Sequence, residues 1–250
     1  MLEKAMISGV VHTREELVYR VTGLGADCCE IYTDVEGIFT ADPRIVPHAR
    51  KLDVVSYDEM LEMAASGAKV LQLRSAEFAR NHNVRLHVRS TFADRDGTWI
   101  TEEDDPMLEK AMISGVVHTR EELVYRVEGI GADALFDALA RASVNVDTIV
   151  QITADEIVFS APTEDRRDAE RTLDSLGARW SSRDDLGKVS IVGAGMKSHP
   201  GIAAKTFATL REQGVEPAVV TTSPIKIACH IPTGDVEKAV RALHEAFDLA

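Results

Sequence analysis

The residues best suited to chemistry lie in the segment YTDVEGIFTADPR, which runs from Tyr32 to Arg44 and follows a predicted strand. This segment combines the hydroxyl of Thr33 and the carboxylates of Asp34 and Asp42 with the guanidinium of Arg44. Loops at the carboxyl ends of strands are where α/β folds bind ligands, and an arginine can hold a phosphate through two parallel hydrogen bonds. A surface turn rich in Asp and Pro explains the same composition equally well, so the pattern by itself leaves both interpretations open.

A second candidate is the segment SHPG, which ends at Gly201 and predicts the start of a helix with Pro200 in the first helical position. The N–H groups of Gly201, Ile202 and Ala203 would have no partner inside the helix, and such donors can hold a carboxylate. Ordinary helix capping is the simpler interpretation of this spacing. His199 by itself indicates neither a metal site nor catalysis.

Three Gly-x-Gly triplets, at residues 23–25, 129–131 and 193–195, lie next to predicted strands. None completes the Gly-x-Gly-x-x-Gly pattern with a later acidic residue that marks a dinucleotide site, so we interpret them as turn glycines. Lys69 follows a predicted helix and is a weak signal on its own.

The composition excludes several classes of function. The chain of 250 residues has a net charge of -13 and 45% hydrophobic residues, which predicts a globular protein with both signs of charge mixed on its surface. We expect no nucleic-acid ligand and no membrane span, because the chain is acidic and no apolar run reaches about 18 residues. The three cysteines, two of them adjacent, fit neither a disulfide framework nor a metal site and favour a reducing cytoplasm.

One segment of the sequence occurs twice. Residues 1–27 and 107–133 agree at 25 of 27 positions, and the sequences that follow the two copies diverge at once. The repeat is therefore a transplanted segment and not the period of a repeat protein. Within both copies, ELVYRV has the alternation of a half-buried strand.

The elements that must position these residues indicate two kinds of fold. Strands at 28–34 and 84–90 enclose two predicted helices, at 57–67 and 75–82, which is typical of α/β layering. The polar segment FADRDGTWITEEDDP, residues 92–106, is predicted to be an exposed link between domains.

The remaining sequence contains two similar units, each with a strand ending in glycines, a helix, two strands and a second helix. The first opens with ELVYRVEGIG at Glu122 and the second with KVSIVGAGM at Lys188. This order is typical of the ferredoxin-like fold, in which helices cover one face of an antiparallel sheet. Ala239, Leu243 and Phe247 recur at the spacing of one buried helix face.

Taken together, these segments resemble aspartate kinase. The resemblance runs from about Gly23 to Leu249 and rests on CEIYTDVEGIFTADPRIVP, DEMLEMAASGAKVLQLRS, VNVDTIVQ, GKVSIVGAGMKSHPG and ALHEAF, in the family's order. It implies an α/β and α+β protein, in which a partial amino-acid-kinase α/β sandwich precedes two ferredoxin-like ACT domains. It also implies ATP-dependent phosphorylation of aspartate with Mg²⁺, the first step toward lysine, threonine and methionine, under feedback control by amino acids.

The resemblance divides the chain into four segments. Residues 1–27 would be a duplicated segment in place of the amino-terminal part of the kinase, and 28–105 the carboxyl-terminal fragment of the kinase domain with a linker. Residues 106–182 would be the first ACT domain and 183–250 the second.

The resemblance also implies two sets of site residues, and no catalytic residue or metal ligand. The residues that would contact ATP are Thr33, Asp34, Phe39, Asp42, Arg44, Lys69 and Val70. The residues that would contact lysine or threonine are Asn145, Val146, Asp147 and Gln151 in the first ACT domain and Ile202, Ala203, Glu216, Pro217, Ser223 and Pro224 in the second. Helix-start N–H groups suit the carboxylate of a free amino acid, and Asp147 suits its ammonium group.

Departures from the family limit the expected activity. The family's Lys-Phe-Gly-Gly-Thr-Ser and Gly-Arg-Gly-Gly-Ser-Asp segments are absent from the sequence, and phosphoryl transfer depends on donors around the transferred group. We therefore expect the chain alone to be inactive as a kinase and to act as an amino-acid-sensing regulatory part. Its expected partner is a second copy, paired through the ACT domains, or a full-length aspartate kinase subunit. A folded chimera without ligand or activity is the alternative.

Two further departures fall in the ACT domains. The first domain lacks the family's Asp-x-Pro-Gly turn before its helix, and Pro224 replaces a glutamate and removes a backbone donor. Both changes predict altered or lost feedback control.

The duplicated segment has a different setting in each copy. The second copy lies where the family begins its regulatory region, and we hypothesise that the similarity of GLGAD to GIGAD marks the junction of the first. A strand suited to an ACT sheet would then precede a partial kinase domain with exposed edges and apolar surface. We predict that residues 28–100 are less stable than residues 107–250.

Overall fold

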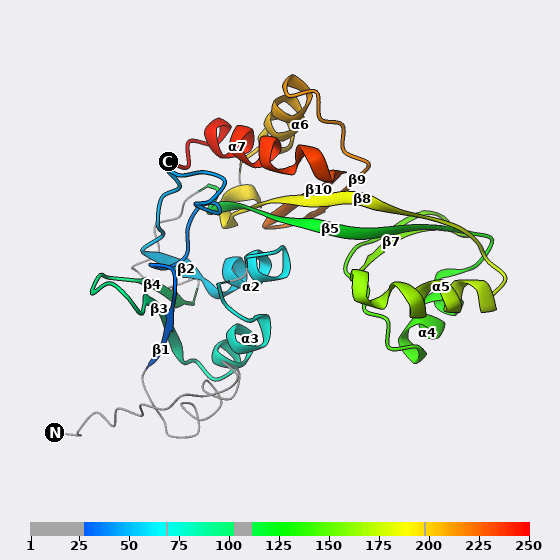
Figure 1. The fold of residues 1–250 in the computed structure, drawn as a ribbon, viewed down its shortest axis with the longest axis horizontal. Helices are drawn as coiled ribbons and strands as arrows, with labels where there is room; N and C mark the ends of the chain where they lie inside the picture. The colour runs from blue at the N-terminus through cyan, green and yellow to red at the C-terminus, as the bar shows by residue number, and fades with distance from the viewer. Residues whose placement is uncertain (1–27, 69, 103–111, 198) are drawn as a thin grey trace. The chain divides into compact units, whose positions relative to one another are not determined.

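The computed structural model describes residues 28–68, 70–102, 112–197 and 199–250, which form two compact units (Figure 1). Among the described residues, we call 28–39 and 50–102 the first unit, and 40–49 and 112–250 the second unit. Several predictions lie outside the described residues: the first copy of the duplicated segment with its glycine triplet, Lys69, Ser198 and residues 103–106 of the predicted link.

The first unit is built on a four-stranded sheet in the order β1-β3-β4-β2. Strand β3 pairs parallel with β1 and antiparallel with β4, and β2 pairs parallel with β4. Helices α2 and α3 complete the α/β layering that the sequence predicts. The elements are β1 (Cys28–Thr33), β2 (Val54–Ser56), α2 (Tyr57–Ala65), α3 (Leu73–Asn81), β3 (Arg85–Ser90) and β4 (Thr98–Thr101).

Helix α2 begins with a capping box that the sequence analysis did not identify. The hydroxyl oxygen of Ser56 accepts the backbone N–H of Glu59 at 3.2 Å, and the Glu59 carboxylate accepts the backbone N–H of Ser56 at 3.3 Å. Met60 and Met63, about one turn apart, are fully buried. The helix is therefore anchored at its start and along one face.

The prediction of an exposed link over residues 92–106 is wrong in part. Thr98–Thr101 forms strand β4, and Thr98 and Ile100 are fully buried. The Thr98 hydroxyl donates to the carbonyl of Leu52 at 2.5 Å and accepts the N–H of Ile38 at 2.8 Å. The surrounding polar residues concealed a short strand that pairs with the preceding strand β3 and with the more distant β2.

The second unit is built on a six-stranded antiparallel sheet in the order β6-β7-β5-β8-β10-β9. Its strands are β5 (Gly115–Glu128), β6 (Ile149–Thr153), β7 (Glu156–Ala161), β8 (Arg179–Val192), β9 (Val219–Ser223) and β10 (Lys226–Pro232). Its helices are α4 (Ala132–Arg141), α5 (Arg166–Ser175), α6 (Ile202–Glu212) and α7 (Val236–Ala246), with short 3₁₀ turns η1 (Thr163–Asp165), η2 (Ala194–Lys197) and η3 (Thr233–Asp235).

Strands β5 and β8 are each 14 residues long and serve both ferredoxin-like halves (Figure 1). One half has the spatial order β8-β5-β7-β6, and the other has β5-β8-β10-β9. The start of β5, from Gly115, therefore completes the half whose other elements come after β8 in the chain. The proposed boundary between residues 182 and 183 falls inside β8, and both strands begin earlier than the sequence predicted, at Gly115 and Arg179.

Register irregularities between β5 and β8 mark the junction of the two halves. Pairing shifts between Thr119 and Glu122 and again between Glu122 and Val124. Such bulges bend a strand and increase its twist, which lets one long strand serve two domains.

Each helix pair of the second unit covers its own core. Helices α4 and α5 bury Leu139 and Leu173 against Tyr125 of β5 and Phe159 of β7. Helices α6 and α7 contribute to a second core, whose buried members include Leu210, Val240, Leu243, Val189 and Ile191. The predicted helix face is confirmed for α7, since Ala239 and Leu243 are buried and Phe247 packs against the same core.

Residues 40–49 belong to the second unit, although the residues on both sides of them belong to the first. Ala41, Ile45 and Val46 are buried members of the core under α6 and α7. The Val116 N–H at the start of β5 donates to the Thr40 carbonyl at 2.7 Å. Residues 40–44 of this excursion belong to the segment that the sequence analysis selected for ligand binding.

The glycine triplets have different structural causes. Gly129 adopts a φ of +81°, so a turn glycine is confirmed there. At Gly193, an added Cβ would lie 2.4 Å from the carbonyl oxygen of Met112, so this glycine permits close backbone approach. Gly195 also approaches the Met112 backbone and lies in the 3₁₀ turn η2, where the Met196 N–H donates to the Gly193 carbonyl at 3.3 Å.

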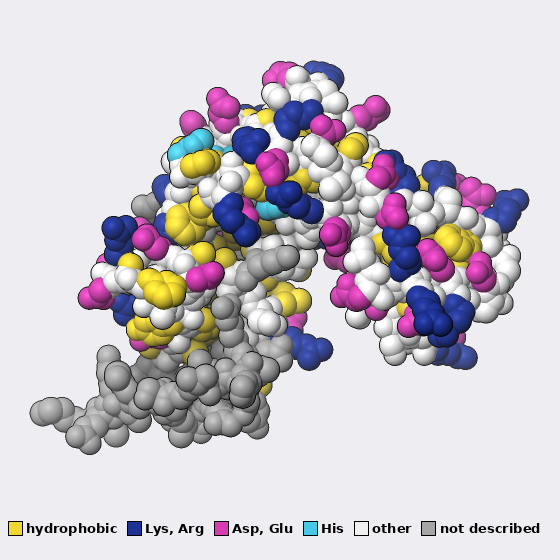
Figure 2. All heavy atoms as spheres, viewed as in Figure 1, with side chains coloured by type: hydrophobic (Ala, Val, Ile, Leu, Met, Phe, Trp, Pro, Cys, Tyr) yellow, Lys and Arg dark blue, Asp and Glu magenta, His cyan; other side chains and the backbone are white. Residues whose placement is uncertain are grey.

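The surface of the described residues carries both signs of charge. Figure 2 shows Lys and Arg interleaved with Asp and Glu over the face that it presents. Within the described ranges, the structure contains no helix that is both long and apolar enough to cross a membrane.

Candidate nucleotide and effector sites

Thr33 and Asp34 lie at the carboxyl end of β1, as predicted from the segment YTD. The Thr33 hydroxyl donates to the Asp34 carboxylate at 2.9 Å, and the Thr33 carbonyl accepts the N–H of Thr91 at 2.8 Å. Thr33 is buried and Asp34 is exposed. The structure therefore presents one carboxylate to solvent at this edge of the sheet and fixes it through the neighbouring hydroxyl.

Asp42 and Arg44 form a two-pronged ion pair on the 40–49 excursion. The Arg44 Nε donates to the carboxylate at 3.0 Å and its Nη2 at 2.6 Å, and the Arg44 backbone N–H donates at 2.9 Å. The hydrogen bonds from Arg44 hold the pKa of Asp42 below its ordinary value, although partial burial opposes this effect. The Arg44 side chain is 87% exposed, so a phosphate could reach it by sharing the guanidinium with Asp42.

The remaining predicted nucleotide residues belong to the first unit. Phe39 is half-buried and pairs with Lys51 in an isolated bridge, and Val70 is half-buried after helix α2. Thr33, Asp34, Phe39 and Val70 thus belong to the first unit, and the Asp42–Arg44 pair belongs to the second.

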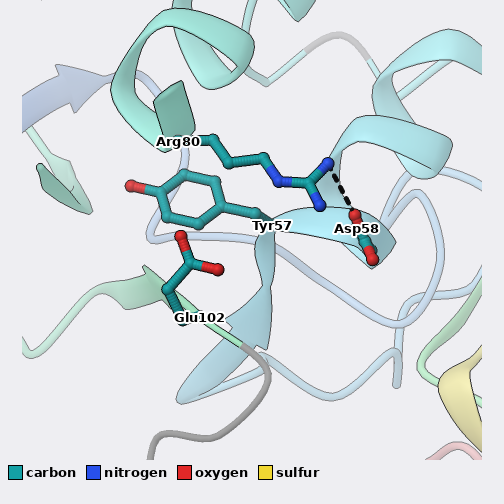
Figure 3. A pocket seen from close by; sticks show the side chains of 4 residues that line it. All are labelled: Tyr57, Asp58, Arg80 and Glu102. Carbon is teal, nitrogen blue, oxygen red and sulfur yellow. Dashed lines mark ion pairs between the residues drawn. The ribbon is translucent and has the colours of Figure 1, made fainter. Parts of the chain in front are cut away.

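A small polar hollow of about 140 Å³ lies in the first unit (Figure 3). Tyr57, Asp58, Arg80 and Glu102 line it, and Arg80 pairs with Asp58 at 2.7 Å. Burial raises the pKa of Tyr57, whose hydroxyl donates to the Val84 carbonyl. None of the predicted nucleotide residues lines this hollow, and its size suits no nucleotide.

The predicted effector residues of the first ACT half lie on and before the edge strand β6. The Asn145 N–H donates to the Asp165 carboxylate at 2.9 Å, and Val146 packs against the core under α4 and α5. Gln151 is exposed in the middle of β6. Asp147 is fixed through its N–H, which donates to the Ser160 carbonyl at 3.1 Å.

Asp147 takes part in a buried charge network that the sequence analysis missed. The Lys188 ammonium contacts the Asp147 carboxylate and lies 3.1 Å from the Glu122 carboxylate. The Thr119 hydroxyl donates to Glu122 at 2.6 Å, and the His230 ring lies 3.7 Å from it. The one sequence signal for this network is Lys188, which opens the apolar strand segment KVSIV.

The pKa values of this network follow from its charges. Burial alone would raise the pKa of Glu122, but the interaction with His230, the charge of Lys188 and the hydroxyl of Thr119 lower it to about 2. Burial alone would lower the pKa of Lys188, and the charges of Glu122 and Asp147 raise it above its ordinary value. Asp147 is therefore already paired with an ammonium group.

The predicted effector residues of the second ACT half lie at the start of α6 and beside β9. Helix α6 begins at Ile202, and its N-cap is Gly201, with a φ of 103° and no side-chain cap. The prediction that Pro200 takes the first helical position is therefore wrong, because the chain needs a left-handed residue immediately before the helix. Ile202 is buried in the core and Ala203 is exposed. The first N–H groups of any helix have no partner inside the helix itself.

The other residues of this set are close to strand β9. Glu216 is exposed and Pro217 half-buried ahead of the strand, and Ser223 ends it. Pro224 forms the exposed turn to β10, where the Ser223 hydroxyl accepts the N–H of Ile225 at 3.3 Å.

The two effector sets lie near opposite edges of the six-stranded sheet, since β6 forms one edge and β9 the other. Between them, Val150 of β6 and Val219 of β9 both pack against Val124, Val158 and Leu186. A hollow of about 400 Å³ opens at this apolar patch. It is lined by Val124, Arg126, Val150, Ile152, Val158, Ser181, Ser182, Arg183, Leu186, Ala218, Val219 and Val220.

The structure offers no metal site among the residues it describes, where no group of three or more His, Cys, Asp or Glu side chains converges. Cys28, Cys29 and Cys229 are free thiols. Burial raises the pKa of Cys229 to about 12 and that of Cys29 to about 11, which keeps both thiols protonated and poor as ligands.

These features define a class of protein: an α/β unit followed by a unit of two ferredoxin-like halves. The model of the amino acid kinase family matches residues 18–90, and the model of the ACT domain matches residues 189–247.

Similar proteins narrow this class. The aspartokinase of Mycolicibacterium smegmatis is 46% identical over 247 residues, which cover 90% of this chain and 58% of that protein. A solved chain described as aspartokinase alpha and beta subunits is 35% identical with a TM-score of 0.51, and the match covers 55% of this chain and 99% of that one. The chain belongs to the aspartokinase family.

The fold likeness extends to a full-length enzyme structure. Aspartokinase III of E. coli in complex with aspartate and ADP has a TM-score of 0.83 at 22% identity, covering 93% of this chain and 55% of that one. The same enzyme is also known in complex with lysine and aspartate, with a TM-score of 0.75 at 24% identity. The chain spans 58% of the length of the Mycolicibacterium relative.

Proposed function

We propose that this chain is the amino-acid-sensing regulatory part of an aspartokinase and that it binds lysine, threonine or both. The observation that carries this proposal is the complete pair of ferredoxin-like halves in one compact unit. The match to 99% of a solved aspartokinase subunit chain supports it, since 55% of this chain suffices to cover that subunit. The lysine complex of aspartokinase III supports lysine as one ligand.

The contacts proposed for an amino acid follow from its two charges. Its carboxylate would accept the N–H groups at the start of α6, which have no side-chain cap. Its ammonium group would share Asp147 with Lys188, because the Asp147 side chain remains 43% exposed. These two positions lie in different halves of the sheet, so a complete site would combine the halves of two chains paired through their ACT domains.

The family reaction is a second part of the proposal. Aspartokinases would use ATP with Mg²⁺. Here we propose Thr33 and Asp34 of the first unit and, separately, Arg44 of the second unit as nucleotide contacts. The exposed Asp34 carboxylate suits a hydrated magnesium ion, and the exposed Arg44 suits a phosphate. Bound Mg²⁺ would neutralise phosphate charge. We propose that the chain meets these ligands in a cytoplasmic assembly, as a homodimer or with a full-length aspartokinase subunit.

Isothermal calorimetry of the chain with lysine and with threonine tests the sensing function. We expect saturable binding of at least one of the two. In Asp147→Asn, the association constant for the amino acid should fall about tenfold, because the ligand ammonium loses an ionic acceptor. Asp137→Asn is the matched control, since Asp137 forms only an exposed i,i+4 pair with Arg141 on α4. A folded chain that gives no heat with either amino acid would support the ligandless chimera instead.

A further inference from the structure

A buried polar joint connects the 40–49 excursion to the rest of the second unit. The Thr40 hydroxyl lies 2.9 Å from His244 Nε2 on helix α7 and 2.9 Å from the carbonyl oxygen of Leu249. Thr40 and His244 are both completely buried. A buried polar contact of this kind costs free energy unless its geometry is maintained, so it specifies one arrangement of the excursion.

The hydrogen-bond directions of this joint follow from its chemistry. A carbonyl oxygen can only accept, so the single hydroxyl proton of Thr40 goes to Leu249. His244 must then donate from Nε2, which leaves its Nδ1 without a proton. Among the described residues, the buried Nδ1 has no hydrogen-bond partner, so the joint suits the neutral ring in one tautomer. The edge of the His48 ring packs against His244 at 5.7 Å between centroids.

Other contacts orient the excursion around this joint. The Arg241 Nε on α7 donates to the Ile45 carbonyl at 3.1 Å, and Val116 N–H donates to the Thr40 carbonyl at 2.7 Å. Ile45 and Val46 are buried in the core to which α7 contributes. Contacts with α7, β5 and Leu249 thus fix the backbone that carries the Asp42–Arg44 pair.

We infer that His244 is a positioning residue, which acts through Thr40 to hold the segment Thr40–Arg44 on helix α7 of the regulatory unit. The consequence for ligand binding rests on the nucleotide role proposed above for Arg44. If the segment faces a nucleotide, helix α7 of the amino-acid-sensing unit sets the position of the segment. A displacement of α7 would then alter nucleotide affinity with no change in any residue that touches the nucleotide.

Hydrogen–deuterium exchange of the full chain tests the joint without any ligand. In Thr40→Val, which keeps the shape but loses both hydroxyl bonds, amides of residues 40–49 and of Val116 should exchange about tenfold faster. Thr40→Ser should exchange like the wild type, because it restores the hydroxyl. Thr206→Val is the matched control, since Thr206 is buried in α6 and its hydroxyl donates only to Ile202. Unchanged exchange in Thr40→Val would overturn the inference.

Titration with a fluorescent ADP analogue tests the consequence for binding. The wild type and Thr40→Ser should bind alike, and Thr40→Val about tenfold more weakly. A wild type that binds no ADP analogue would refute the nucleotide role of Arg44. The hydrogen–deuterium exchange result would still test whether Thr40 and His244 hold the segment. Equal affinity of Thr40→Val and a binding wild type would overturn the positioning of Arg44.

A spectrum of the wild type alone covers the case in which Thr40→Val does not fold. In ¹⁵N-histidine spectra, His244 should carry its proton on Nε2 and none on Nδ1. The opposite tautomer would contradict the joint.

Discussion

Single residues matter most in this protein where charge is buried. Glu122 and Lys188 are 8% and 3% exposed, and they balance each other together with Asp147. Removing one partner of a buried ion pair leaves the other charge uncompensated, which costs more than the pair itself contributes. The network connects the loop before β6 to strands β5 and β8 and so joins the two halves of the sheet.

The lowered pKa of Glu122 predicts a specific pH dependence of stability. Its pKa is about 2 in the folded state against 4.5 as the ordinary value, so its contribution is complete above about pH 4.5 and is lost as the pH falls toward 2. This contribution is about 3 kcal/mol at neutral pH.

Urea unfolding at several pH values tests this dependence. Glu122→Gln should be destabilised at pH 7, and the difference between its free energy of unfolding and that of the wild type should shrink in acid. Glu121→Gln, an exposed neighbour, is the control. A constant difference down to pH 2 would contradict the assignment.

At the scale of elements, strands β5 and β8 determine the fold of the second unit. Each contributes to both ferredoxin-like halves, and each contains an irregularity where the halves meet. The second copy of the duplicated segment supplies β5, so its predicted strand ELVYRV is confirmed as part of a longer one. The shared strands explain why both halves belong to one compact unit.

Gly187 of β8 gives a test of this junction. An added Cβ would lie 2.6 Å from a methyl group of Val236 and 2.7 Å from the Thr119 carbonyl oxygen. Gly187→Ala should therefore destabilise the second unit by about 1 to 3 kcal/mol through overpacking. Gly234→Ala is the matched control, because a Cβ there meets nothing within 4 Å. Chemical denaturation measures both, and equal midpoints would show that β8 can shift at no cost.

At the scale of the whole molecule, the chain consists of two units that differ in how they are stabilised. The second unit has a six-stranded sheet with a core under each helix pair. In the first unit, β1 pairs only with β3 among the described strands, and Phe92 is 82% exposed. Sheets with open edges and exposed apolar side chains are less protected against local opening.

This difference predicts the order of proteolysis. Under limiting trypsin, the first unit should be cut before the second, because local opening exposes its backbone more often. Mass spectrometry should identify a surviving fragment that contains residues 112–250. Survival of residues 1–100 with cleavage inside the six-stranded sheet would contradict this prediction.

The sequence by itself determined the local elements, the family and the order of the two folds. Helix periodicity, as in α7, and strand alternation, as in ELVYRV, are properties of neighbouring residues, and family phrases such as CEIYTD persist as contiguous text. Tertiary structure alone decided which strands pair across the halves, that Thr98–Thr101 forms a strand, and that the predicted effector sets lie near opposite edges. It also decided that Lys188 meets Asp147 and that Thr40 meets His244. The physical reason is that pairing and burial depend on residues distant in the chain, whose approach no local pattern encodes.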